Sequence, residues 1–322
     1  MNRREFIGAM GGLIAVSALP GCQTFKGEDR ESVFAKRGKF ERLIIGGVNL
    51  KIGATEPFSI LHISDTHFTS AYDHESKEKR KLAKIRTQTF GGKQEEALRD
   101  SLDWAKLNVD YVLHTGDLID FQSEANFDLV RKYFGGISMC AVGNHEYSPS
   151  MWFTPRKKGT TDAEWREQSF AALKSAYPMD LLFSSKVVNG INFVMIDNSF
   201  ATVSENQVER FHQEVKKGLP IVLASHVPYM TENIWILKER YWRNQGRKFR
   251  NAAPPPPSGD LKRQLEDKVT KDFIAYLKSE KLLKAIFVGH EHMVTQDRFS
   301  PTAMEYAVGG NFAFHGQEIL FS

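Results

Sequence analysis

Residues 58–67, FSILHISDTH, join a short apolar run to an Asp-Thr-His triplet. In four later segments of the chain, a short apolar run is likewise followed by residues that can bind a metal ion. The five runs SILHI, YVLHT, SMCAV, PIVLA and AIFV end at Ser64-Asp65-Thr66-His67, Gly116-Asp117-Leu118-Ile119-Asp120, Gly143-Asn144-His145-Glu146, Ser225-His226 and Gly289-His290-Glu291-His292, respectively. A short apolar run of this kind is typical of a buried strand. Residues that follow such strands collect at one edge of an open α/β sheet, so the sequence predicts an α/β fold with a site for two divalent ions at that edge.

The five residue sets, in this order, resemble the signature of the calcineurin-like metallophosphoesterases. They extend from Asp65 to His292, which is most of the chain, and each follows a predicted strand. Single GD and GH dipeptides are common, so the specificity of the signal comes from the complete set. The resemblance implies a four-layer α/β/β/α sandwich, in which two mixed sheets are flanked by helices.

The resemblance also implies which side chains bind the two ions. The first ion is expected to bind Asp65, His67, Asp117 and His292. The second is expected to bind Asp117, Asn144, His226 and His290. A carboxylate such as that of Asp117 can bridge ions that lie about 3.5–4 Å apart. Imidazole and oxygen donors without thiolate suit manganese, iron or zinc, and the sequence does not choose among these.

The implied reaction is hydrolysis of a phosphoric ester by in-line attack of a hydroxide that the two ions hold. His145 matches the non-ligand histidine of the family and is expected to stabilise or protonate the leaving oxygen. Asp120 matches the acidic residue that orients this histidine.

Two positions narrow the class of enzyme. Asp120 stands where purple acid phosphatases carry a tyrosine ligand, and Phe121 stands where protein Ser/Thr phosphatases carry an arginine. The chain therefore resembles the single-domain, cyclic-nucleotide-phosphodiesterase-like branch, and a phosphodiester is only slightly favoured as substrate over a phosphomonoester. A phosphomonoesterase or pyrophosphatase that acts on envelope lipids or nucleotide sugars is the alternative. A catalytically silent, metal-bearing binding protein of the cell envelope is an alternative of another class, which the intact His145 disfavours.

Residues 1–22 resemble an export signal. Arg3 and Arg4 precede Phe6 and a short apolar stretch, as in a twin-arginine signal. Residues 19–22, LPGC, resemble a lipobox, in which Cys22 becomes a lipidated N-terminus that anchors the protein to a membrane. An ordinary signal cut near Gly21 is the alternative. Both interpretations predict an exported protein of the periplasm or cell envelope.

Residues 23–40 are polar and charged and are predicted to be a tether, followed by a metallophosphoesterase domain at 41–322. Residues 228–259 are expected to be an irregular basic, aromatic and Pro-rich insertion. Its Arg243, Arg247 and Arg250 would bind an anionic or lipid-phosphate substrate, because arginine can bind phosphate bidentately. A solvated surface insertion is an equally weighted alternative.

The net charge of the chain limits the kinds of partner that it is expected to bind. A net charge of +4 is mildly basic and does not indicate a nucleic-acid partner. We therefore expect a phosphorylated small molecule or lipid as substrate. Of the two cysteines, Cys22 and Cys140, the second lies in an apolar run and is expected to be a small buried hydrophobe.

Periodicity predicts the remaining elements. Helices are expected at 93–107, 124–134, 162–176, 205–217 and 260–277, and further strands at 43–45, 48–52, 181–187, 191–196, 294–299, 303–308 and 318–321. The basic run Lys77–Arg86 is interpreted as a charged loop or helix face. His62 and His114 stand within apolar runs and are expected to be packed core residues, and no role is assigned to His74, His212 or His315.

Overall fold

The computed structural model describes residues 40–148, 161–229, 231, 233–238 and 259–322. Residues Arg42–Ser322 form one compact unit. The predicted export signal, nearly all of the predicted tether, and Arg243, Arg247 and Arg250 lie outside the described residues. Among the described residues, no helix combines the length and the apolar character that a membrane span requires.

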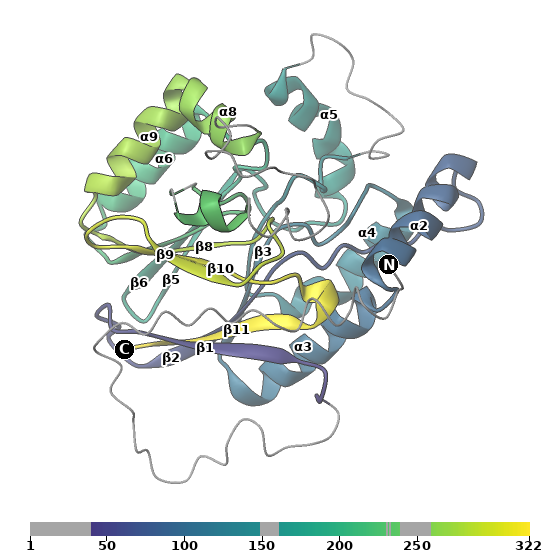
Figure 1. Cartoon of the computed structure of the whole chain (residues 1–322), viewed down its shortest axis with the longest axis horizontal. Helices are drawn as coiled ribbons and strands as arrows, with labels where there is room; N and C mark the ends of the chain where they lie inside the picture. Colours follow the sequence, from purple (N-terminus) through teal and green to yellow (C-terminus); the bar gives the residue numbers. More distant parts are fainter. Residues whose placement is uncertain (1–39, 149–160, 230, 232, 239–258) are drawn as a thin grey trace, which may run out of the picture. The chain divides into compact units, whose positions relative to one another are not determined.

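Two mixed β-sheets form the centre of the unit (Figure 1). In spatial order, the first contains β1 (Ile44–Leu50), β11 (His315–Phe321), β2 (Phe58–Ile63), β3 (Tyr111–Thr115) and β4 (Met139–Ala141). The second contains β5 (Phe183–Val188), β6 (Ile191–Ile196), β7 (Ile221–Ala224), β8 (Leu283–Val288), β10 (Met304–Ala307) and β9 (Thr295–Arg298). Strands β2, β3 and β4 are parallel, as are β6, β7 and β8, so each set ends at one edge of its sheet.

Helices cover the outer faces of the two sheets. The helices are α2 (Lys77–Phe90), α3 (Gln94–Asn108), α4 (Glu124–Tyr133), α5 (Asp162–Lys174), α6 (Glu205–Val215), α8 (Asp260–Glu266) and α9 (Lys268–Ser279), with short 3₁₀ turns at Phe134–Gly136 and Asn311–Ala313. Figure 1 shows α6 and α9 along the second sheet, and α3 and α4 beside the first. The predicted sandwich of two mixed sheets with helices outside is confirmed.

Alternating side chains of the central strands divide the core into three apolar layers. In β7, Val222 packs between the two sheets, whereas Leu223 packs against α6 and α9. In β2, Ile60 packs between the sheets, whereas Leu61 packs with α3. A strand that is buried on both faces appears in sequence as a continuous apolar run, which is why the runs were recognisable.

Several predicted elements are confirmed closely. Strands β2 and β3 match their predicted apolar runs, and the strands predicted at 181–187 and 191–196 are β5 and β6, which pair as an antiparallel hairpin. At its turn, Asn189 and Gly190 adopt φ values of 43° and 81°, which these two residue types tolerate. The run Lys77–Arg86 is helical, and its helix continues to Phe90.

Three predictions are wrong in detail. The strands expected at 43–45 and 48–52 are the single strand β1, because its Gly46 and Gly47 pair in register with β11. The helix expected at 260–277 is divided into α8 and α9 at Asp267, whose side chain accepts a hydrogen bond from Thr270 N at 2.8 Å and caps α9. The insertion 228–259, expected to be irregular, contains a helix at 233–238.

A buried acid in β10 makes a prediction about stability. Glu305 is 0% exposed, and burial raises the pKa of its carboxyl to about 8. The folded state therefore favours the neutral acid, and stability is lost as the pH rises from the ordinary glutamate range through about 8. Replacing Glu305→Gln removes this loss, so its stability gain over the native protein should grow with pH over that window, by at most about 1.4 kcal/mol per pH unit.

Denaturant unfolding between pH 5 and 9 measures this difference. Glu209→Gln, an exposed substitution on α6, is the matched control and should follow the native curve. A constant difference between Glu305→Gln and the native protein across this range would contradict the prediction.

Candidate metal centre

The loops that follow the parallel strands are tied to one another by backbone hydrogen bonds. After β2 and β3, Asp65 N donates to Gly116 O and His67 N donates to Asp117 O, both at 2.9 Å. Between the sheets, His290 N donates to Asp65 Oδ2 at 3.0 Å. These bonds bring together the side chains that the sequence predicted to converge.

Five of the seven candidate ligands adopt backbone conformations that are rare for residues with a side chain. Their φ values are 56° for Asp65, 54° for His67, 54° for Asp117, 69° for His290 and 53° for His292. A Cβ added at the neighbouring Gly289 would lie 1.9 Å from Ser64 Oγ, and one at Gly143 would lie 2.2 Å from Asp117 Oδ1. Left-handed backbone is concentrated at functional sites, and here it turns the side chains toward a common point.

The first group of donors is Asp65, His67 and His292, whose ligand atoms lie within 4.8 Å of one another. His67 Nδ1 lies 3.1 Å from Asp120 Oδ1. An ionised carboxylate only accepts, so Nδ1 carries a proton, and when the ring is neutral Nε2 presents its lone pair. This Nε2 lies 3.1 Å from His292 Nε2, which is itself 3.3 Å from Asp65 Oδ1.

The second group is Asp117, His226 and His290, whose ligand atoms also lie within 4.8 Å of one another. His226 Nδ1 donates to Thr115 O at 2.8 Å, which leaves Nε2 facing the group. His290 has the opposite tautomer: Nε2 donates to Asp260 Oδ2 at 3.2 Å, and Nδ1 faces His226 Nε2 at 3.2 Å. Two lone pairs that face each other at this distance repel unless a cation or a proton lies between them.

Asp117 and Asn144 complete a donor set that fits two divalent cations. Asp117 Oδ2 lies 3.7 Å from His67 Nε2 and 3.1 Å from His226 Nε2, so one carboxylate oxygen faces both groups. In the described part of the chain, the buried Asn144 Oδ1 has no hydrogen-bond partner. Buried carboxylates, imidazoles and an amide oxygen are the donors that manganese, iron and zinc accept.

The centre is strongly polarised. Burial opposes ionisation of Asp65 and Asp117, but the surrounding histidines outweigh burial and lower the pKa of both carboxyls. Burial likewise opposes protonation of His67 and His226. Hydrogen bonds and charges from Asp120, Asp65 and Asp117 outweigh it and raise both imidazole pKa values to about 9.

Next to the donors lies a pair formed by His145 and Asp120. His145 Nδ1 lies 3.0 Å from Asp120 Oδ1 and 2.9 Å from Asp120 O, and His145 Nε2 lies 3.9 Å from Asp117 Oδ2. Burial opposes ionisation of Asp120, but Arg86, His145 and His67 hold the pKa of its carboxyl far below the usual range. Burial opposes protonation of His145, and Asp117 and Asp120 raise its pKa above the ordinary value.

Sequence reasoning missed several residues that hold the centre in place. The buried Glu146 accepts hydrogen bonds from the backbone N–H groups of Asp117 at 3.0 Å and Gly143 at 2.7 Å. Its position directly after His145 was a usable signal. Arg86 and Asp260 had no local signal. Arg86 belongs to a basic run that resembles any charged loop or helix face, and Asp260 follows the insertion without a metal-binding motif beside it.

Asp260 itself is part of a charged cluster. Lys238 Nζ, at the end of the helix at 233–238, lies 3.3 Å from Asp260 Oδ2 and 2.5 Å from Glu291 Oε1. The insertion therefore reaches a side chain that orients His290.

The histidines predicted to be packed core residues are buried. His62 Nε2 lies 2.9 Å from Thr115 Oγ1, and His114 Nε2 lies 3.0 Å from Thr66 Oγ1. Burial lowers the pKa of His62 to about 3 and that of His114 to about 4, so both rings are neutral at physiological pH.

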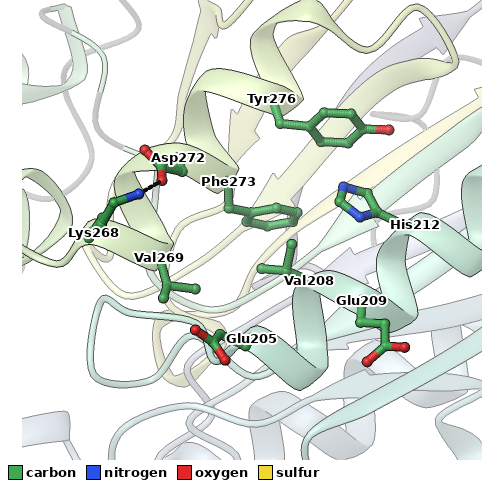
Figure 2. A pocket seen from close by; sticks show the side chains of 9 residues that line it. All are labelled: Glu205, Val208, Glu209, His212, Lys268, Val269, Asp272, Phe273 and Tyr276. Carbon is green, nitrogen blue, oxygen red and sulfur yellow. Dashed lines mark hydrogen bonds and ion pairs between the residues drawn. The ribbon is translucent and has the colours of Figure 1, made fainter.

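A separate open depression of about 720 Å³ lies between α6 and α9 (Figure 2). Its lining residues are Glu205, Val208, Glu209, His212, Lys268, Val269, Asp272, Phe273 and Tyr276. None of them is a candidate ligand, so the depression is distinct from the centre at the strand ends.

Comparison with known proteins agrees with this arrangement. The family model described as calcineurin-like phosphoesterase matches residues 58–294, and the chain belongs to this family. It is therefore a metallophosphoesterase, a hydrolase that acts on phosphoester bonds. A comparison with curated protein sequences gave no match.

Three solved structures that match the chain share little sequence with it. A dimetal phosphatase from Danio rerio is 15% identical with a TM-score of 0.48, and the alignment covers 80% of this chain and 88% of that one. PhoD is 10% identical with a TM-score of 0.47, over 82% and 58% of the two chains. The purple acid phosphatase PPD1 from yellow lupin (Lupinus luteus) is 11% identical with a TM-score of 0.44, over 81% and 45%.

The raised imidazole pKa values predict that metal uptake depends on pH. In the metal-free protein, His67 and His226 bind protons up to about pH 9, and a cation must displace these protons. The apparent affinity for manganese or zinc should therefore rise by about tenfold per pH unit for each displaced proton between pH 6 and 9.

Chelator-competition titrations of the metal-free protein at several pH values measure this slope. His212→Gln in the separate depression is the matched control and should reproduce the native slope. An affinity that is constant over this pH range would show that protons do not compete for these imidazoles.

Proposed function

We propose that the protein is a dinuclear-metal phosphodiesterase whose ions are held by Asp65, His67, Asp117, Asn144, His226, His290 and His292. The observation that carries the proposal is the position of Asp117 Oδ2, which faces His67 Nε2 at 3.7 Å and His226 Nε2 at 3.1 Å. One carboxylate thus serves two imidazole groups that come from different sheets, as a two-ion site requires.

The bound ions supply Lewis acidity toward the phosphoryl oxygens and lower the pKa of water. The protein orients the donors. Asp120 and Thr115 O fix the protonated nitrogens of His67 and His226, so that each ring offers its other nitrogen. Asn144 adds an oxygen donor without adding negative charge.

His145 is proposed to stabilise or protonate the leaving oxygen. Asp120 holds its Nδ1, and its Nε2 lies beside Asp117 with the side chain 14% exposed, so the ring borders both the donors and solvent. A proton on Nε2 can then pass to an oxygen that departs on the side of the phosphorus away from the attack.

The preference for a diester rests on positions 120 and 121. Both oxygens of Asp120 are engaged by Arg86, His67 and His145, so it acts as a positioning residue and does not substitute for a tyrosine ligand. Phe121 is buried and stands where an arginine would bind the substrate in protein Ser/Thr phosphatases. These features support the cyclic-nucleotide-phosphodiesterase-like branch over purple acid and protein Ser/Thr phosphatases.

The substrate class can be tested with the metal-loaded protein. We expect hydrolysis of bis-p-nitrophenyl phosphate in the presence of manganese, with a higher kcat/KM than for p-nitrophenyl phosphate. Asp117→Asn should abolish both activities, because the bridging charge is lost. Faster hydrolysis of the monoester would contradict the diester preference, and hydrolysis of neither ester or pyrophosphate would contradict an enzymatic role.

The role of His145 makes a second prediction. For an ester with a poor leaving group, such as diphenyl phosphate, His145→Ala should lower kcat by about 10²- to 10⁴-fold, while the metal content stays close to native. Metal analysis of the same sample provides the control. A variant that loses its ions, but regains normal turnover when they are restored, would show that His145 is a ligand instead.

A further inference from the structure

Arg86 on α2 makes a bidentate ion pair with the buried carboxylate of Asp120. Nε lies 2.7 Å from Oδ2 and Nη2 lies 2.8 Å from Oδ1. The side chain of Asp120 is 0% exposed and that of Arg86 is 17% exposed. Two parallel bonds from a planar guanidinium fix the rotation of a carboxylate as well as its position.

The carboxylate that Arg86 holds is shared by two imidazoles. Asp120 Oδ1 lies 3.1 Å from His67 Nδ1 and 3.0 Å from His145 Nδ1. The first ring is a candidate metal ligand and the second is the candidate acid. His145 Nδ1 also lies 2.9 Å from the main-chain oxygen of Asp120. A rotation of the carboxylate would therefore displace the His67 ring and remove the charged contact from His145, which would keep its main-chain contact.

Helix α2 contacts the same region through Phe90. The Phe90 ring stacks on His67 with a centroid distance of 4.3 Å and an interplanar angle of 12°. Arg86 lies one helical turn earlier, and its Cζ is 4.8 Å from the Phe90 centroid. Arg86 and Phe90 thus form one face of α2 that packs against His67 and Asp120, whereas Lys84 on the same helix is exposed.

We propose that Arg86 is a positioning residue that, through Asp120, holds His145 for leaving-group protonation and His67 for cation binding. The proposal rests on the proposed function for its first half. Its second half concerns metal binding alone and is independent of any substrate. Arginine suits this position better than lysine, because its planar guanidinium binds both carboxylate oxygens whereas a lysine ammonium offers only a point charge.

Leaving-group dependence tests the first half. p-Nitrophenolate departs with little protonation, whereas phenolate depends more on an acid. Arg86→Met should therefore lower kcat for diphenyl phosphate about tenfold more than kcat for bis-p-nitrophenyl phosphate, with KM nearly unchanged. Arg86→Lys should recover part of the difference, and Lys84→Met should match the native protein. Equal losses on both esters, or no loss, would overturn this half.

Metal affinity tests the second half. Arg86→Met should weaken one of the two binding steps for manganese or zinc by about 10- to 100-fold, because His67 loses its orientation. The other step should be unaffected, and Lys84→Met should change neither. Affinities equal to those of Lys84→Met would overturn the positioning of His67.

The two measurements also separate this inference from the proposed function. If the native protein hydrolyses no ester, the proposed function fails, and the binding titration still decides whether Arg86 positions His67. Thermal unfolding controls for loss of structure. If Arg86→Met does not fold, Arg86→Gln, which also removes the charge, provides the same comparison.

Discussion

The carboxylate of Asp117 lies where the loops that follow the two sheets meet. It follows β3 of the first sheet, and its Oδ2 lies 3.1 Å from His226 Nε2, which follows β7 of the second. Its Oδ1 accepts a hydrogen bond from His145 N at 2.9 Å. Burying a charge is costly unless it is paired and hydrogen-bonded. The sheets can therefore pack around Asp117 only because these partners satisfy its carboxylate. The fold and the site therefore depend on the same buried charge.

The backbone around Asp117 is also held in a conformation that it would not adopt alone. Asp117 and His67 have positive φ values, and such strain persists only where surrounding structure enforces it. Glu146 stabilises this conformation, because its carboxylate accepts hydrogen bonds from the N–H groups of Asp117 and Leu118 at 3.0 and 2.7 Å. Tyr177 donates to the same carboxylate at 3.0 Å. Residues that never face the centre thus determine where its donors lie.

Features that depend on neighbouring residues could be predicted from the sequence, whereas features that depend on distant residues could not. The bounds of β2 and β3 were predictable because each apolar run ends at an Asp of the donor set. The continuity of β1 across Gly46 was not, because its hydrogen bonds come from β11 at the far end of the chain. Arg86 was interpreted as part of a charged loop or helix face for a similar reason. Its partner Asp120 is 34 residues away, and only the fold brings them together.

The side chains that orient His67 and His290 come from different parts of the chain. His67 is oriented by Asp120, which Arg86 of α2 holds in place. His290 is oriented by Asp260 of α8, which contacts Lys238 of the insertion at 3.3 Å. Side chains that orient a ligand influence its affinity for the metal. The contact with Arg86 of α2 therefore bears on His67 and His145, whereas the contact with Lys238 of the insertion bears on His290.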